Sequence, residues 1–173
     1  MNSKLQHLFD SLEVEKNTLL ASIKNVSPEK LQQAQEGKWS INQILAHLIA
    51  AEKLSVQYLN KKMLGLKDAG DTGIWEEIKL VVLQVSQRLP LRFKAPRAVV
   101  ESTPMYSNMA ELQADWDNTR AELKNLLEKF DETQLQKKIY KHIFAGRLNI
   151  QHGLVFLKEH MMHHRPQISR LLK

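Results

Sequence analysis

Apolar residues recur at helical spacing along most of this 173-residue chain, and the pattern predicts an all-α protein. We expect helices over residues 3–24, 40–63, 73–89, 108–130 and 150–172, four of them long and the third shorter. Ser27 and Pro28 predict a further short helical turn that ends near residue 35. No segment has the alternation of a convincing strand, and the chain contains no repeat of fixed period.

Cap residues mark the beginnings of two of these helices. Ser40 and Gln43 form an S-x-x-Q capping box, in which each side chain hydrogen-bonds the backbone N–H of the other residue. Asn149 stands at the cap position ahead of the last helix. We therefore expect the second and the last helix to begin directly after Ser40 and Asn149.

Three prolines mark a long connection between the third and fourth helices. Pro90, Pro96 and Pro104 predict an extended and irregular path over residues 91–108. Such a connection can cover a functional site or simply carry the chain between the ends of the molecule, and both readings are open. We predict that residues 1–173 form a single domain, an up-down four-helix bundle with a long crossover that carries an extra helix.

The absence of cysteine excludes several kinds of site. The chain cannot form disulfides, iron–sulfur sites or thiolate zinc sites, and it suits a reducing cytoplasm, where we expect the protein to reside. The N-terminus lacks the hydrophobic run of a signal peptide. No window approaches about 18 consecutive apolar residues, so we expect no membrane-spanning segment.

The net charge of +6 raises the question of nucleic-acid binding. Basic side chains gather in two places along the chain, first Arg88, Arg92, Lys94 and Arg97, and then Lys137, Lys138 and Lys141. Neither place has the interleaved aromatic residues that stack on bases. We therefore expect no nucleic-acid partner and attribute the charge mainly to solubility, with some preference for an anionic small-molecule substrate.

The segment from Glu159 to Ile168 contains three of the seven histidines and points to metal chemistry. His160 and His164 are four residues apart, so a helix places both imidazoles on one face, a common arrangement for two nitrogen ligands. By helical phase, His163 points farther from the buried face and His152 farther still. The alternative is that these histidines only complement the negative end of the helix dipole.

A metal site needs a third ligand, and helical phase makes His47 the candidate. His47 lies at the shoulder of the apolar stripe of the helix over residues 40–63, whereas His7 and His142 have no such support. Glu52 falls inside that stripe, where an unpaired carboxylate is costly. It is predicted either to form an ion pair or to support the site from behind the ligands, and the sequence does not choose between these roles.

In their order along the chain, these residues resemble the DinB-like superfamily of metal-binding four-helix bundles. The resemblance rests on Trp39-Ser40, Ile44-Leu45-x-His47-Leu48 and Glu52, on the Gly146-x-Leu148-Asn149 entry to the last helix, and on His160-x-x-x-His164 with Gln167-Ile168. With the long crossover, it covers nearly the whole chain. Pro166 departs from the family pattern, which commonly has glycine or another residue there, and a proline inside a helix predicts a kink.

The resemblance implies a divalent metal ion, Ni or Zn, held by His47, His160 and His164. Glu52 and His163 are then candidates for groups that support the site from outside the ligand set, and no catalytic residue is assigned. The family is frequently dimeric, so we expect a homodimer. Members are described as metal-dependent hydrolases, and some relatives are transferases or isomerases that use a low-molecular-weight thiol.

Three readings of the function are open. A neutral three-histidine site leaves a +2 centre with an open position, which lowers the pKa of bound water toward about 7 and suits hydrolysis of a small molecule. The same centre can activate a low-molecular-weight thiol for S-transfer to electrophiles. The third reading is a non-catalytic module that binds a metal or a ligand. Imidazole ligands do not separate Zn, Ni, Fe and Cu, so the metal is left open.

Overall fold

The computed structural model describes residues 1–34, 36–89 and 96–173, and it confirms the predicted all-α architecture. Four long helices form the bundle: α1 (Ser3–Ile23), α3 (Ile41–Met63), α6 (Met109–Leu127) and α7 (Ile150–Leu171). The described remainder contains α2 (Pro28–Gln32), α4 (Ile74–Arg88), α5 (Arg97–Ser102), two short 3-10 turns at Leu66–Asp68 and Glu132–Gln134, and the strands β1 (Tyr140–His142) and β2 (Gly146–Leu148).

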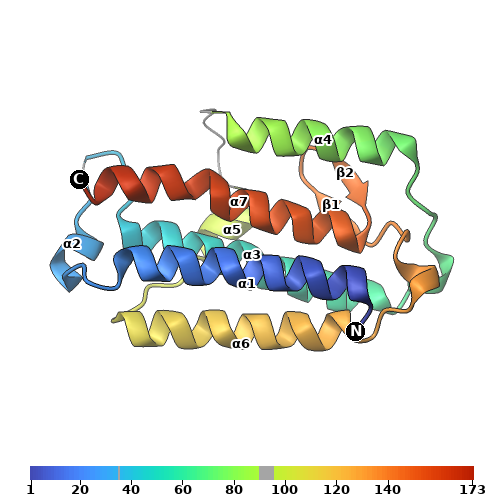
Figure 1. The fold of residues 1–173 in the computed structure, drawn as a ribbon, viewed down its shortest axis with the longest axis horizontal. Helices are drawn as coiled ribbons and strands as arrows, with labels where there is room; N and C mark the ends of the chain where they lie inside the picture. Colours follow the sequence, from blue (N-terminus) through green and yellow to red (C-terminus); the bar gives the residue numbers. More distant parts are fainter. Residues whose placement is uncertain (35, 90–95) are drawn as a thin grey trace.

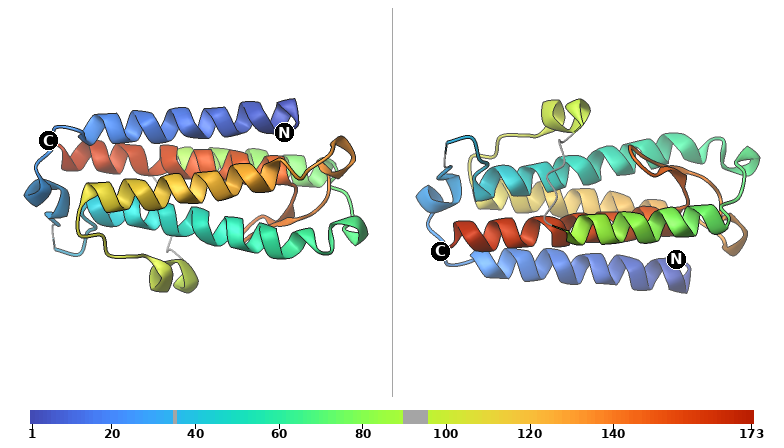
Figure 2. Two further views of the ribbon diagram at one scale, coloured as in Figure 1. Left: turned by 90° about the horizontal axis from the view of Figure 1, so that it is seen from below. Right: turned by 90° about the horizontal axis from the view of Figure 1, so that it is seen from above.

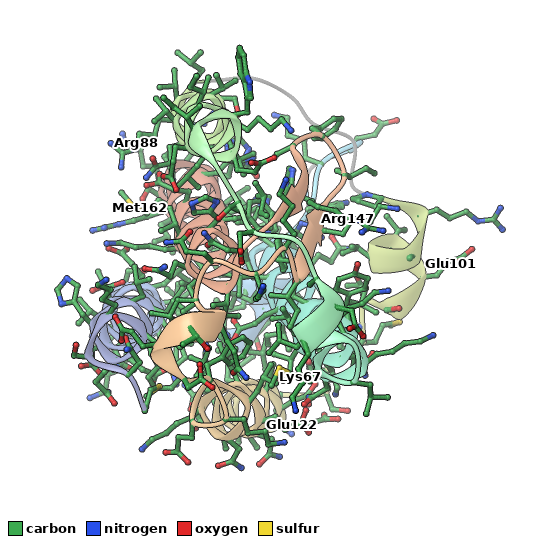
Figure 3. All side chains as sticks on the ribbon, turned by 90° about the vertical axis from the view of Figure 1, so that its right-hand side faces the viewer. Lys67, Arg88, Glu101, Glu122, Arg147 and Met162 are labelled. Carbon is green, nitrogen blue, oxygen red and sulfur yellow. The ribbon has the colours of Figure 1, made fainter. Side chains whose placement is uncertain are left out.

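The crossover sets the direction of the second half of the bundle. α1 and α3 are antiparallel, the crossover returns the chain to the end where α3 began, and α6 therefore runs parallel to α3 before α7 runs back (Figure 1). Viewed along the bundle, α1, α3, α6 and α7 form a four-helix cross-section, with α4 stacked outside α7 and α5 beside α3 (Figure 3). Within the described ranges, no helix combines the length and the apolarity needed to cross a membrane.

Side-chain caps begin each of the four bundle helices. Asn2, Ser40, Asn108 and Asn149 each accept a hydrogen bond from a backbone N–H in the first turn that follows. The Ser40 cap is the predicted capping box, because the Gln43 side chain accepts the N–H of Ser40 at 2.8 Å in return. The core between these helices is one continuous cluster of aliphatic side chains around the fully buried Trp116.

The expectation that residues 91–108 are irregular is wrong in part, because α5 occupies Arg97–Ser102. A helix of six residues is too short to show a 3.6-residue period, and none of its side chains is fully buried, so the apolar pattern carries no sign of it. Pro96, one of the three prolines used to predict an irregular path, is its N-cap residue. Pro90, Arg92 and Lys94 lie outside the described residues.

The expectation of no strand is also wrong, because β1 and β2 pair as an antiparallel hairpin with Tyr140 opposite Leu148. Each strand has only three residues, which is too few for an alternating pattern to be recognised. Packing on α7 stabilises the hairpin, since the Tyr140 ring lies against Gly153, where a Cβ atom would meet ring carbon at 3.0 Å. Gly146, with φ of +74°, provides the left-handed residue that ends the turn.

The buried His142 holds the tip of the hairpin. Its Nδ1 accepts the backbone N–H groups of Phe144 at 3.2 Å and Ala145 at 3.1 Å, so this nitrogen carries a lone pair and the ring is neutral. Burial lowers the pKa of His142 from its usual 6.5 to about 4. Protonation would place a hydrogen on Nδ1 and remove both acceptor contacts.

Acid should therefore destabilise the hairpin through His142. The pKa is lower in the folded state than in the unfolded state, so the stabilisation is complete above pH 6.5 and is lost as the pH falls toward 4. When the pH falls from 7.5 to 4.5, the free energy of unfolding of the native protein should decrease by about 2 kcal/mol more than that of His142→Asn. The asparagine side chain keeps an acceptor oxygen that does not titrate. Urea unfolding of both proteins at the two pH values measures this difference, and equal losses would contradict it.

Candidate metal centre

Two helices carry the three predicted histidines to one point in the bundle. His47 is two turns into α3, and His160 and His164 lie on successive turns of α7, which packs against α3. One Nε2···Nε2 distance, from His47 to His160, is 3.2 Å, and that from His160 to His164 is also 3.2 Å. One ring nitrogen from each of the three lies within 4.8 Å of the others, so the group can hold a metal ion.

These distances suit a metal ion better than a set of hydrogen bonds. Ligand nitrogens of a tetrahedral site with metal–nitrogen bonds of about 2.0–2.1 Å lie about 3.3 Å apart, close to the two separations observed. The Nε2 atom of His160 faces two other Nε2 atoms, and one ring nitrogen cannot make a good hydrogen bond to both. A cation between the rings would be shared by all three lone pairs.

The histidines are neutral at pH 7 and are therefore ready to ligate. Burial lowers the pKa of His47 to about 4 and that of His164 to about 3, and the neighbouring imidazoles act in the same direction. Burial also lowers the pKa of His160 well below its usual range, with His164 and His47 adding to the effect. Neutral imidazole is the form that binds a metal, so no proton has to be displaced at pH 7.

Gln167 orients His164. Its Oε1 lies 3.0 Å from His164 Nδ1, so the ring donates its Nδ1–H to this oxygen and keeps the Nε2 lone pair pointed toward the other histidines. The spacing of three residues between His164 and Gln167 puts them on one helical face, a signal that sequence reasoning had available and did not use.

Replacement of Gln167 should weaken metal binding without preventing it. Gln167→Ala removes the acceptor that fixes the His164 tautomer, and we expect the affinity for Zn²⁺ or Ni²⁺ to fall by about 10–100-fold. Gln167→Glu keeps an acceptor oxygen and should retain most of the affinity. Competition titration against a chromophoric chelator measures both variants; an affinity that is the same for Gln167→Ala and the native protein would rule out the orienting role.

Of the two residues expected to support the site, His163 lies beside a predicted ligand and Glu52 faces another helix. His163 lies next to His164, with ring centroids 5.2 Å apart, and its Nδ1 is 2.8 Å from the backbone oxygen of Gln87 on α4. Glu52 is turned toward α6 instead: one carboxylate oxygen accepts the Trp116 indole N–H at 3.1 Å, and the other lies 2.5 Å from Nε of Arg120. Of the two roles left open for Glu52, the structure shows the ion pair.

Aromatic rings flank the three histidines. The Trp39 ring centroid lies 4.9 Å from that of His47, and Phe156 stacks on His160 at 5.5 Å with an interplanar angle of 12°. Trp39 is 39% exposed and His160 is partly exposed, so both side chains reach the protein surface. The site therefore combines three nitrogen donors with apolar surfaces on either side.

The burial of two side chains of α7, Glu159 and His152, was not predicted. Glu159 is buried and accepts two hydrogen bonds from Arg88 of α4, at 2.9 and 2.7 Å. His152 was expected to point away from the buried face and is instead 4% exposed, because α4 covers this side of α7 and its Glu77 lies 3.0 Å from His152 Nε2. Helical phase considers one helix at a time and cannot show which side a crossover helix covers.

Pro166 does not interrupt the last helix. α7 continues to Leu171, and Pro166 is exposed two residues beyond His164. His160 and His164 precede it, so the departure from the family pattern still leaves these two histidines beside His47.

This helical bundle with a three-histidine group matches a known family. The model of the DinB superfamily matches residues 11–168, and the chain belongs to that superfamily. Searches of curated proteins and of solved structures return no match. The family assignment therefore agrees with the helical fold, and it does not assign a reaction.

Proposed function

We propose that the protein is a metal-dependent enzyme that hydrolyses a small molecule at a divalent ion held by His47, His160 and His164. The two Nε2···Nε2 separations of 3.2 Å at His160, with one ring nitrogen of each histidine within 4.8 Å of the others, support this proposal. Zn²⁺ or Ni²⁺ bound there would act as a Lewis acid and lower the pKa of a bound water toward about 7. Three neutral ligands leave a fourth coordination position, which a structural site would have filled with protein.

The chain's own residues would prepare this site in three ways. The three histidines hold the ion without neutralising its charge, and Gln167 fixes the direction of one ring. Trp39 and Phe156 provide apolar surface for a substrate and limit the access of water. His163, whose ring centroid lies 5.2 Å from that of His164, is a candidate group for exchanging a proton with a substrate.

A second candidate is S-transfer from a low-molecular-weight thiol to an electrophile. The absence of cysteine favours it, because no protein thiol competes with an external thiol for the metal. Coordination to a divalent ion would deprotonate the thiol. The two chemistries share the ligand set and differ in the nucleophile that the site receives.

An assay of metal-loaded and metal-stripped protein distinguishes the candidates. Ester and amide turnover that needs Zn²⁺ or Ni²⁺ and no thiol supports hydrolysis, whereas loss of an electrophile that needs both metal and thiol supports transfer. A third outcome is a tightly bound metal whose removal unfolds the protein, together with no reaction of any substrate in the panel. That outcome would identify the site as a non-catalytic module. A protein that contains no metal and takes up none would end all three proposals.

Nucleic acid is not a partner in this proposal. The described members of the two basic groups are largely engaged in ion pairs: Arg88 with Glu159, Arg97 with Glu101, Lys137 with Asp71, and Lys138 with Glu76. Such pairs reduce the charge available to phosphates. We also propose a cytoplasmic location, which the cysteine-free composition favours.

A further inference from the structure

The apolar face of α4 points away from the protein. Seven large apolar side chains of this helix and its C-cap residue are between 46% and 75% exposed: Ile74, Trp75, Ile78, Val81, Val82, Val85 and Leu89. At 100° per residue they form one stripe about 120° wide. The side chains that α4 buries, Glu76, Leu83 and Gln87, lie on the opposite side, against α7. Figure 1 shows α4 at the edge of the molecule, outside the bundle, and the right-hand view of Figure 2, seen from above, shows it in front of α7.

We propose that this stripe is the interface of a homodimer, in which α4 packs antiparallel against α4 of a second copy of the chain. The exposed area of the seven side chains is on the order of 700 Å², above the roughly 300–600 Å² of the largest apolar patch on a typical monomer. It is close to the roughly 800 Å² that each partner contributes to a standard-size interface. The proposal does not depend on the metal or on the reaction.

The spacing of the apolar residues fits a second helix of the same sequence. Ile74, Ile78, Val81 and Val85 follow steps of four, three and four residues, the pattern by which one helix packs along another. A two-fold axis between residues 81 and 82 would place an apolar residue opposite an apolar residue at every level: Ile74 with the partner's Leu89, Ile78 with the partner's Val85, and Val81 with the partner's Val82. This register is self-complementary, as a two-fold interface requires.

The ends of the stripe match in the same register. Trp75 of one copy comes level with Arg88 of the other, and a guanidinium over an indole ring is a favourable contact. Arg88 keeps its pair with Glu159 within its own chain, and its side chain is 61% exposed, so it remains accessible to a partner. Antiparallel packing also sets the N-terminal half of α4, which contains Glu77, beside the partner's C-terminal half.

A membrane surface is a poorer occupant of this face. Helices that lie in a membrane interface present a basic polar face to the lipid head groups. The polar side of α4 is instead buried against α7, where Glu76 pairs with Lys138 from beyond the helix. The charges that flank the stripe, Glu77, Lys79 and Arg88, are of both signs.

Two single substitutions and their mixture test the register. The native protein should sediment as a dimer at micromolar concentration. Ile78→Glu and Val85→Lys each bury an unpaired charge, so each should weaken the dimer at least about 100-fold and give monomers. Mixed in equal amounts, the two variants should form a heterodimer, because the new carboxylate then faces the new amine. Val14→Glu is the matched control, since Val14 is 61% exposed on α1, and it should remain dimeric.

Cross-linking provides a second readout that does not introduce a charge. The chain has no cysteine, so in Val82→Cys a short bis-maleimide can react only at that position. The reagent should join two copies of Val82→Cys efficiently. It should not join two copies of Val14→Cys, although position 14 is equally exposed. Circular dichroism checks that every variant is folded. A native monomer, a dimer that Ile78→Glu leaves intact, or a mixture that stays monomeric would each overturn the proposal.

Discussion

Replacement of His160 by alanine is expected to abolish tight binding of Zn²⁺ or Ni²⁺. His160 is the central member of the group, since its Nε2 faces both His47 and His164 at 3.2 Å. Without it, the remaining pair provides two ligands from separate helices. Loss of a group that merely orients a ligand costs about 10–100-fold in affinity, so loss of a ligand should exceed about 100-fold.

The histidine next to this pair provides a matched control. His163→Ala removes an imidazole from the same helix, at a residue whose Nδ1 faces the backbone oxygen of Gln87 on α4. We expect its metal affinity to stay within about tenfold of the native value. Metal content after purification and competition titration measure both variants. If both variants lost the same metal affinity, the effect would come from a disturbance of the helix rather than from the loss of a ligand. Unchanged metal binding in His160→Ala would contradict the proposed ligand set.

The bundle and its histidines could be predicted because both depend on the period of a single helix. The apolar spacing located all four bundle helices to within a few residues, and the same arithmetic placed His160 and His164 together on one face. His47 needed a further step, since two helices meet only through tertiary packing. Its position at the edge of an apolar stripe was sufficient to choose it over His7 and His142.

The features that were missed depend on contacts between elements. The hairpin of β1 and β2 forms because Tyr140 packs on Gly153 of α7, and nothing within its three-residue strands indicates this. α4 was predicted as an amphipathic helix, but periodicity does not say which way the apolar side faces. In the structure that side is exposed, and the burial of His152 and Glu159 under its polar side follows from the same arrangement.

Glu52 shows how a sequence can identify an unusual residue without assigning its role. An acid in an apolar stripe was expected to have a partner, and the structure provides Arg120, with the two side chains 4% and 3% exposed. Arg120 also approaches Glu13 of α1, with 3.3 Å between Nη1 and Oε1, so it links α1, α3 and α6. Burial raises the pKa of Glu52, and the Arg120 guanidinium and the Trp116 indole N–H oppose this rise.

Removal of Arg120 alone should destabilise the protein more than the loss of any of the histidines. Arg120→Met leaves the Glu52 carboxylate buried without its cation, and breaking a buried pair in this way costs about 3–5 kcal/mol. In a chain of this length, such a loss lowers the Tm by about 10 °C. Thermal unfolding followed by circular dichroism, with urea titration for the free energy, measures the change.

The double variant Glu52→Gln with Arg120→Met separates the ion pair from the packing around it. The glutamine amide introduced by Glu52→Gln is uncharged and its oxygen can still accept the Trp116 N–H, so most of the lost stability should return. If Glu52 acts only in the fold, the double variant should bind metal as the native protein does, because the oxygens of this side chain face α6. A stable double variant that binds metal poorly would instead give Glu52 a role at the metal centre, through the helix that it shares with His47.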